Sequence, residues 1–387
     1  MSSWGKTLTT TTWKIAAAYV GGIVGAGFAS GQEIVQFFAL FGRNGLLGAL
    51  GATVLLALLG RIFMQLAYTG DTRSHRELLA EICGRKWAVY FDLALALFLL
   101  GTLAIMIAGS GALMQEYLQS PSYYGSLAIS AGVLLILAFG VNGFLAWNLA
   151  LVAVLLGITV LIGSAALIGY GPGWMGPLKP GLPAIKGGML IPNWWIAAVL
   201  YTSYNSSLML ALAASIGRAR ERGTQEKIPA GQRKFALGRE LASSGEFALG
   251  GLLGGICLGS LVFFMAVVLL SAGEGAIHSP LPMYAIARVL GPLPHYGYVL
   301  SLWIAMWSTA TSCTYSLSRR IAEMLGLNWR VAAGLAVGIA FALARIGFSE
   351  LIRTVYPAFG YIWLIFLLLL ARYRLGGRTC TKPPRQV

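Results

Sequence analysis

Long apolar segments, separated by short polar ones, recur along the whole chain of 387 residues. An apolar stretch of about 20 residues is long enough for an α-helix to cross the hydrocarbon core of a bilayer. The pattern therefore predicts an all-α integral membrane protein with ten transmembrane helices. The predicted spans are residues 12–39, 45–69, 87–118, 124–141, 145–169, 191–216, 241–271, 294–318, 329–347 and 351–372.

Two amphipathic stretches occupy equivalent places in the two halves of this series. Residues 74–84 lead into the third span, and residues 279–291 lead into the eighth. Because they are five spans apart, they would lie on opposite sides of the membrane. Such a pattern is typical of a five-plus-five inverted repeat, in which the first helix of each half is expected to be discontinuous. We predict a single transmembrane domain over residues 1–387, with its repeats at 12–169 and 191–372.

The composition agrees with a membrane protein, since hydrophobic residues make up 57% of the chain and charged residues 11%. A net charge of +15 could suggest nucleic-acid binding, but the basic residues lie between apolar segments and form no single basic face. Lysine and arginine accumulate in alternate loops. The positive-inside rule therefore predicts a multi-pass protein of the cell membrane with both termini cytoplasmic, including a basic tail at residues 373–387.

The stretch from Gly21 to Glu33 places five glycines and a carboxylate inside the first apolar segment. A helix should break there. Each backbone group that loses its helical partner in hydrocarbon costs several kcal/mol, so a broken helix needs new partners from protein, water or a bound solute. Close helix packing through small residues is the alternative reading. This stretch is the first candidate binding site.

The sixth segment contains a polar cluster at Tyr201, Thr202, Ser203, Tyr204 and Asn205. By analogy with the first segment, the helix is predicted to break here as well. Serine and threonine can also bond back to their own helix or to a neighbouring helix, so interhelical hydrogen bonding is the alternative explanation.

The run Gly21–Phe28 resembles the unwound part of the first helix in transporters of the amino acid–polyamine–organocation superfamily, which share the leucine-transporter fold. Its continuation, Gly25–Glu33, is similar to the YkvI-like family of bacterial amino-acid permeases. This resemblance implies the leucine-transporter fold for nearly the whole chain and a solute site between the first and sixth spans.

The resemblance also implies one sodium site between the first and eighth spans. Backbone carbonyls of Gly21 and Val24 and hydroxyls of Ser308, Thr311 and Ser312 match the family's ligands. Oxygen ligands at half-helix ends suit such an ion. Packing of these hydroxyls along a buried interface is the alternative. The fifth span has no charged residue, so the lysine that replaces sodium in some relatives is absent.

The solute would contact the backbone after the break, where exposed amides can hold a carboxylate, and the polar cluster of the sixth span. These contacts suit a small amino acid or a related amine. The candidate substrate-binding residues are Gly25, Ala26, Gly27, Phe28, Tyr201, Thr202, Ser203, Tyr204 and Asn205.

Glu33 is a carboxylate inside a membrane segment and is therefore a functional candidate. It could bind a cationic solute, titrate as a proton carrier, or form an outer gate by pairing with Arg353 or Arg345. We favour a gate formed with Arg353, although a purely structural ion pair fits the sequence equally well.

Together these features predict a sodium-coupled secondary active transporter that works by alternating access on a small solute in the bilayer. A proton-coupled permease or exporter using Glu33, or a solute-sensing receptor subunit, are the alternatives. An enzyme is not expected. The three histidines, His75, His278 and His295, do not lie in a span beside a carboxylate or cysteine as catalysis would require.

Overall fold

The structure is a computed structural model that describes residues 9–69, 75–139, 142–170, 190–225 and 243–375. Every regular element in these ranges is a helix. Most of the predicted basic tail lies outside the described residues. The helices of the first half are α1 (Thr10–Ile23), α2 (Ala26–Ser30), α3 (Gln32–Phe37), the 3-10 turn η2 (Ala39–Phe41), α4 (Arg43–Thr69), α5 (His75–Cys83), α6 (Arg85–Leu118), α7 (Ser122–Phe139) and α8 (Asn142–Tyr170).

The second half has a similar series of helices. They are α9 (Trp194–Gln225), α10 (Ser244–Ala272), α11 (Glu274–Ile277), α12 (Pro282–Val289), α13 (Pro292–Leu325), α14 (Trp329–Ala344) and α15 (Phe348–Leu375). These helices coincide with the predicted segments, although α9 and α13 extend beyond their predicted C-terminal ends. The two predicted amphipathic stretches correspond to α5 and α12.

Length and composition identify fewer membrane spans than the ten that the sequence predicts. Within the described ranges, seven helices are long and apolar enough to cross a membrane: α4, α6, α7, α8, α9, α10 and α15. Helices α13 and α14 meet the same criteria only as a pair bent by 117°, which raises the count to eight if the pair is one span. The first segment is divided into short helices and α14 has 16 residues. The ten-span count therefore stays a prediction.

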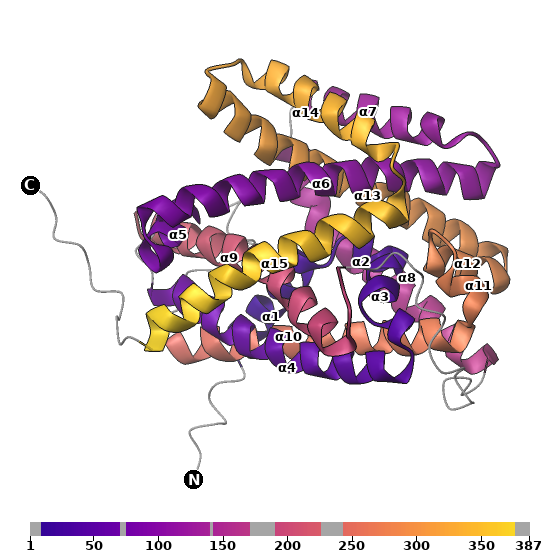
Figure 1. The fold of residues 1–387 in the computed structure, drawn as a ribbon, viewed down its shortest axis with the longest axis horizontal. Helices are drawn as coiled ribbons and strands as arrows, with labels where there is room; N and C mark the ends of the chain where they lie inside the picture. Colours follow the sequence, from indigo (N-terminus) through magenta and orange to yellow (C-terminus); the bar gives the residue numbers. More distant parts are fainter. Residues whose placement is uncertain (1–8, 70–74, 140–141, 171–189, 226–242, 376–387) are drawn as a thin grey trace, which may run out of the picture.

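The long helices run roughly along the longest axis of the molecule (Figure 1). Helices α1, α4 and α10 pack together at one edge, and α7 and α14 pack together at the other. Helices α6, α13 and α15 lie between these two groups. Helix α5 lies at the left end of the bundle in Figure 1, and α11 and α12 lie at the right end. The two amphipathic elements are thus at opposite ends, as an inverted repeat requires.

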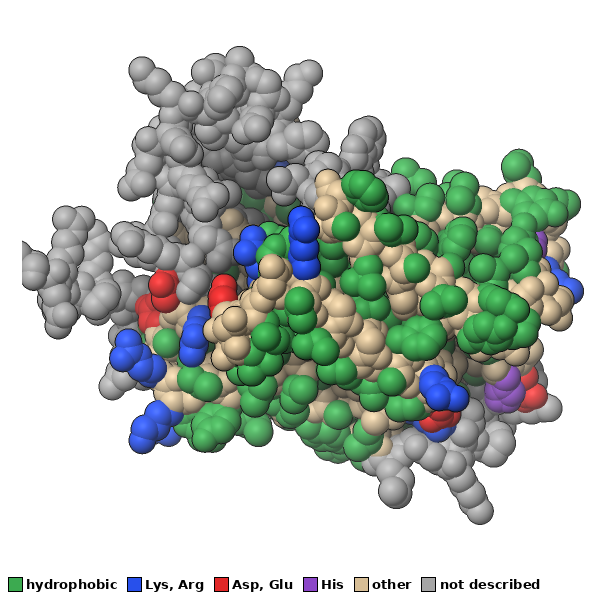
Figure 2. All heavy atoms as spheres, turned by 90° about the horizontal axis from the view of Figure 1, so that it is seen from above, with side chains coloured by type: hydrophobic (Ala, Val, Ile, Leu, Met, Phe, Trp, Pro, Cys, Tyr) green, Lys and Arg blue, Asp and Glu red, His purple; other side chains and the backbone are tan. Residues whose placement is uncertain are grey.

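The surface seen in Figure 2 has a band of hydrophobic side chains between groups of charged side chains toward each end. Large apolar residues such as Leu97, Leu161 and Ile339 are at least half exposed. Exposed apolar surface of this extent is unfavourable in water and is expected where lipid contacts the protein.

The first segment breaks as predicted. Helix α1 ends at Ile23, and Val24 and Gly25 adopt extended backbone conformations before α2 begins. A second interruption follows at Gly31, whose φ of +83° is in the left-handed region that glycine tolerates best. The prediction of a discontinuous first helix is confirmed.

The sixth segment does not break. Helix α9 continues through residues 201–205, and several of its polar side chains bond to carbonyls of their own helix. The Thr202 hydroxyl donates to the Ala198 carbonyl (2.8 Å), and the Ser206 hydroxyl donates to the Ser203 carbonyl (2.7 Å). A hydroxyl satisfied in this way needs no interruption of the helix. The predicted discontinuity of the sixth span is therefore wrong.

Helices α4 and α10 approach each other so closely that glycine is needed between them. A Cβ atom on Gly255 would lie 2.5 Å from the Ala57 Cα atom, and one on Gly259 would lie 2.5 Å from the Thr53 Cα atom. Gly251 makes a similar contact with α4, four residues before Gly255. A row of small residues at this spacing allows close helix packing in membranes, where lipid is as apolar as the side chains.

We predict that Gly255→Ala lowers the stability of the protein by about 1–3 kcal/mol, because the added methyl group would overlap the backbone of α4. Thermal unfolding in detergent would measure the change. The control is Gly338→Ala in α14, where no atom lies within 4 Å of the added Cβ. Equal melting temperatures for the two variants would contradict the close packing of α4 and α10.

Candidate functional site

The break in the first segment exposes backbone groups in the interior of the bundle. The Val24 amide closes α1 by donating to the Val20 carbonyl (2.9 Å), and the Gly25 carbonyl accepts from the Ala29 amide (3.1 Å) as α2 begins. Helix ends leave amides and carbonyls without partners in their own helix. Val24 is 4% exposed, so the groups at this break face other protein elements or a ligand.

Helix α13 contacts the first segment at both ends of α2. The Tyr298 hydroxyl donates to the Ala29 carbonyl (2.8 Å) and thereby links α13 to α2. Further along the same helix, the Thr309 hydroxyl oxygen lies 3.9 Å from the position of a Cβ on Gly25. Thr309 was not among the predicted ion ligands. Its spacing of three residues from Ser312, on one helix face, is a signal that could have identified it.

The predicted ion ligands lie on α1 and α13. Ser308 and Thr311 are buried, and Ser312 is partly buried. The Thr311 hydroxyl donates to the Trp307 carbonyl (2.8 Å), which leaves its oxygen lone pairs able to accept or to bind a cation. On the other side of the break, Gly21 belongs to the last turn of α1 and Val24 follows its end.

Glu33 lies in the first turn of α3 and is 7% exposed. Its Oε2 atom accepts a hydrogen bond from the Tyr204 hydroxyl of α9 (2.8 Å). A Cβ atom on Gly27 would lie 2.5 Å from Glu33 Oε1 and 3.1 Å from the Tyr356 hydroxyl oxygen. The carboxylate, the two tyrosine hydroxyls and the Gly27 backbone therefore meet at one point, although they come from α2, α3, α9 and α15.

Aromatic rings surround this point. The Tyr204 ring is stacked on Tyr356 at 5.0 Å between centroids, and its centroid lies 5.4 Å from that of Tyr201. The Phe37 centroid is 5.6 Å, and the Phe98 centroid 6.2 Å, from that of Tyr204. We call Phe37, Phe98, Tyr201, Tyr204 and Tyr356 the aromatic cage. All five side chains are at most 5% exposed.

The other predicted substrate residues have different positions. The Ser203 hydroxyl donates to the Gly360 carbonyl of α15 (2.8 Å), and the Asn205 amide donates to the Tyr201 carbonyl (2.9 Å). Ala26 and Phe28 are buried in α2. The structure thus brings Gly27, Tyr201 and Tyr204 together around Glu33, whereas Thr202, Ser203 and Asn205 bond to backbone.

The predicted gate pair is not formed in this structure. Arg353 makes an ion pair with Glu350, three residues earlier on α15. Glu33 bonds to Tyr204 instead. A pair within one helix turn requires no movement of separate elements, which favours the Glu350–Arg353 contact over a contact between α15 and α3.

Tyr356 and Phe98 were not predicted. Tyr356 precedes Pro357 inside α15, and a proline within a helix is a visible signal because it removes one helical hydrogen bond and leaves a carbonyl free. Phe98 lies in a long apolar run of α6 that contains no comparable signal.

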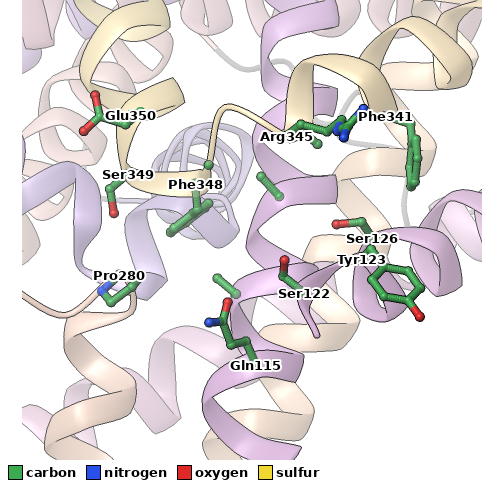
Figure 3. A pocket seen from close by; sticks show the side chains of 14 residues that line it. Gln115, Ser122, Tyr123, Ser126, Pro280, Phe341, Arg345, Phe348, Ser349 and Glu350 are labelled. Carbon is green, nitrogen blue, oxygen red and sulfur yellow. The ribbon is translucent and has the colours of Figure 1, made fainter. Parts of the chain in front are cut away.

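A cavity of about 450 Å³ lies between α6, α7, α14 and α15 (Figure 3). Gln115, Ser122 and Ser126 line it from one side, and Arg345 and Phe348 line it from the other. No residue of the break or of the aromatic cage lines this cavity. The candidate site is therefore the buried break beside Glu33, where backbone groups, a carboxylate and aromatic rings converge.

Comparison with curated proteins shows similarity along nearly the full length. The chain is 26% identical over 377 residues to the uncharacterized membrane protein YkvI of Bacillus subtilis (strain 168), covering 96% of each. It is 24% identical over 358 residues to the uncharacterized protein YyaD of the same strain, covering 92% of this chain and 94% of YyaD. No protein-family model matches the chain.

Solved structures show the same fold. The inward-facing conformation of Mhp1 matches with a TM-score of 0.63 at 14% identity, over 94% of this chain and 77% of that chain. A closed conformation of Mhp1, a nucleobase-cation-symport-1 family transporter with bromovinylhydantoin bound, matches with a TM-score of 0.58 at 13% identity, covering 94% and 79%. The Eremococcus coleocola manganese transporter matches with a TM-score of 0.59 at 15% identity, covering 95% and 78%. These solved structures are of transporters and YkvI is a membrane protein, which agrees with the expectation that the chain is not an enzyme.

We predict that Gly27→Ala displaces the Glu33 carboxylate, because the new methyl group would lie 2.5 Å from its Oε1 atom. The expected loss of stability is about 1–3 kcal/mol, measured by thermal unfolding. Gly22→Ala is the matched control, since its Cβ would come no closer than 3.4 Å to the Leu212 side chain. If both variants melted at the same temperature as the parent protein, the tight contact between Gly27 and Glu33 would be refuted.

Proposed function

We propose that this chain is a secondary transporter that moves a small amino acid or related amine by alternating access, coupled to one sodium ion. The observation that supports this most directly is the interruption of the first segment at Val24 and Gly25, beside the buried Glu33 carboxylate. Discontinuous helices at the centre of a membrane domain are typical of solute and ion sites in transporters. The fold, shared with transporters such as Mhp1, supports the same assignment.

We further propose the ten-span arrangement as a five-plus-five inverted repeat, with both termini cytoplasmic in the cell membrane. In this arrangement α1 to α3 form the first span, and α13 and α14 are separate spans. Support comes from the placement of α5 and α12 at opposite ends of the bundle. The continuous α9 means that only the first repeat begins with a broken helix.

The proposed sodium site lies between the end of α1 and α13. Its ligands are the Gly21 and Val24 carbonyls and the hydroxyls of Ser308, Thr311 and Ser312, with Thr309 near the break. All of these donors are oxygens, which suits a hard alkali cation. Sodium would join α1 to α13 and favour the conformation that binds solute, so that transport follows from a shift between populations.

The proposed solute site uses Gly25, Ala26, Gly27 and Phe28 on one side and the residues around Tyr201–Asn205 on the other. Of the latter, Tyr201 and Tyr204 lie nearest to Glu33. The second candidate function is a proton-coupled permease. It is favoured by one observation: Glu33 is buried and bonded to a tyrosine hydroxyl, so it could exchange a proton during the cycle.

Uptake into proteoliposomes separates these possibilities. With sodium and pH gradients imposed one at a time, we expect accumulation of radiolabelled amino acids or amines only with the sodium gradient. Accumulation driven by the pH gradient alone would favour the proton-coupled function. Binding of solute without counterflow would instead indicate a solute sensor built on this fold.

We expect the double variant Thr311→Ala, Ser312→Ala to lose sodium stimulation of uptake, because it removes two of the proposed hydroxyl ligands. The control is Thr314→Ala on the same helix, whose buried hydroxyl bonds to the Ala310 carbonyl (2.7 Å) and is not a proposed ligand. Sodium dependence of uptake, measured over a range of sodium concentrations, is the readout. Unchanged sodium stimulation in the double variant would eliminate this ion site.

A further inference from the structure

Glu33 is a buried carboxylate without a basic partner in the described part of the chain, where it forms no ion pair. The Tyr204 hydroxyl stabilises one carboxylate oxygen, but a hydroxyl contributes no positive charge. An uncompensated carboxylate in the interior of a membrane protein is costly, and such a residue is expected to meet a cation during its function.

The surroundings of Glu33 have the chemistry of an organic-cation site. The aromatic cage places the rings of Tyr204 and Tyr356 5.0 Å apart, with their hydroxyls at the carboxylate. The ring of Tyr201 lies edge-on to that of Tyr204 at 5.4 Å. The electron-rich faces of such rings attract ammonium groups, with or without methyl substituents.

The same geometry is unfavourable for a solute carboxylate at the break. The Glu33 carboxyl group already lies against the Cα atom of Gly27, since a Cβ there would come within 3.4 Å of the carboxyl carbon. A second carboxylate at the Gly25–Gly27 backbone would be placed close to this charge. Two like charges at short distance in a medium of low dielectric constant repel each other strongly.

We propose that the solute is an organic amine without a carboxylate, whose ammonium group binds Glu33 and the aromatic cage. This inference rests on the proposed transport function. It narrows the proposed substrates from amino acids and related amines to amines that have no carboxylate. Glu33 would supply the negative charge, the buried rings of the aromatic cage would contact the ammonium group, and Gly27 leaves space for the Glu33 carboxylate.

Paired probes test the inference on the purified full-length protein. Alanine and alaninamide, and leucine and leucinamide, differ in whether the carboxylate is present, while choline tests a methylated ammonium. Binding is measured by isothermal titration calorimetry in detergent with sodium present. We expect each amide to bind about tenfold or more tightly than its parent amino acid, which corresponds to about 1.4 kcal/mol.

Three variants and one control variant identify the side chains that bind the amine. Glu33→Gln should weaken amine binding about tenfold or more, because it removes the counter-charge while preserving the shape. Tyr356→Leu should weaken it as well, whereas Tyr356→Phe should retain most of the affinity since the ring remains. Glu116→Gln, the same loss of charge at the far end of α6, is the control and should leave binding unchanged. Size-exclusion profiles establish that each variant is folded.

The outcomes separate this inference from the transport function. Counterflow of alanine with no binding of either amide or of choline would overturn the amine assignment and leave the transporter standing. Amine binding that Glu33→Gln does not weaken would also overturn the assignment. If amine binding required Glu33 but no counterflow occurred, the amine site at the aromatic cage would be supported and the proposed transport function would be overturned. Failure of every amine to bind would refute the inference.

Discussion

A backbone amide or carbonyl that loses its helical partner inside hydrocarbon must find another one, and this constraint governs the first segment of the chain. The interruption at Val24 and Gly25 lies among other helices, with Val24 buried and Gly25 partly buried. Helix α13 contributes the Tyr298 hydroxyl to the Ala29 carbonyl. On the opposite side, α9 and α15 bring tyrosine hydroxyls to the carboxylate that follows the break. Three distant helices therefore contact the segment after the break: α13 bonds to the backbone of α2, and α9 and α15 place hydroxyls at the Glu33 side chain.

The contrast between the first and sixth segments shows that a polar cluster does not by itself indicate a break. Glycine content alone does not indicate one either, since α10 contains six glycines and is continuous. The first and sixth segments both have polar or small residues at their centre. The first has five glycines between Gly21 and Gly31, whereas residues 194–215 have none. Glycine weakens a helix by about 1 kcal/mol relative to alanine and permits left-handed backbone. Hydroxyl side chains such as Ser206 can remain in a helix by bonding to their own backbone. Polarity alone therefore does not predict discontinuity.

The features that could be predicted from the sequence are those that depend on residues close together in the chain. Hydrophobic length located the helices, and amphipathic periodicity located α5 and α12, because both depend on neighbouring residues. The burial of Glu33 also followed from its place in an apolar segment. Its partners did not, since Tyr356 and Phe98 reach it only through the packing of α15 and α6. For Thr309, the spacing from Ser312 indicates the shared helix face, but only the packing of α13 shows that this face lies beside Gly25.

Whether Glu33 serves as a gate or as a ligand site depends on which carboxylate pairs with Arg353, that of Glu33 or that of Glu350. A long-range pair between Glu33 and Arg353 would neutralise both groups and leave the interior without a free charge. Glu350 removes that possibility in this structure because it is one turn from Arg353 on the same helix, where an ion pair requires no alignment of separate elements. Within the described residues, the buried carboxylate then has hydroxyl partners but no cationic side chain paired with it. Local pairing near the end of α15 thus leaves a negative charge inside the bundle for a cation that arrives from outside the chain.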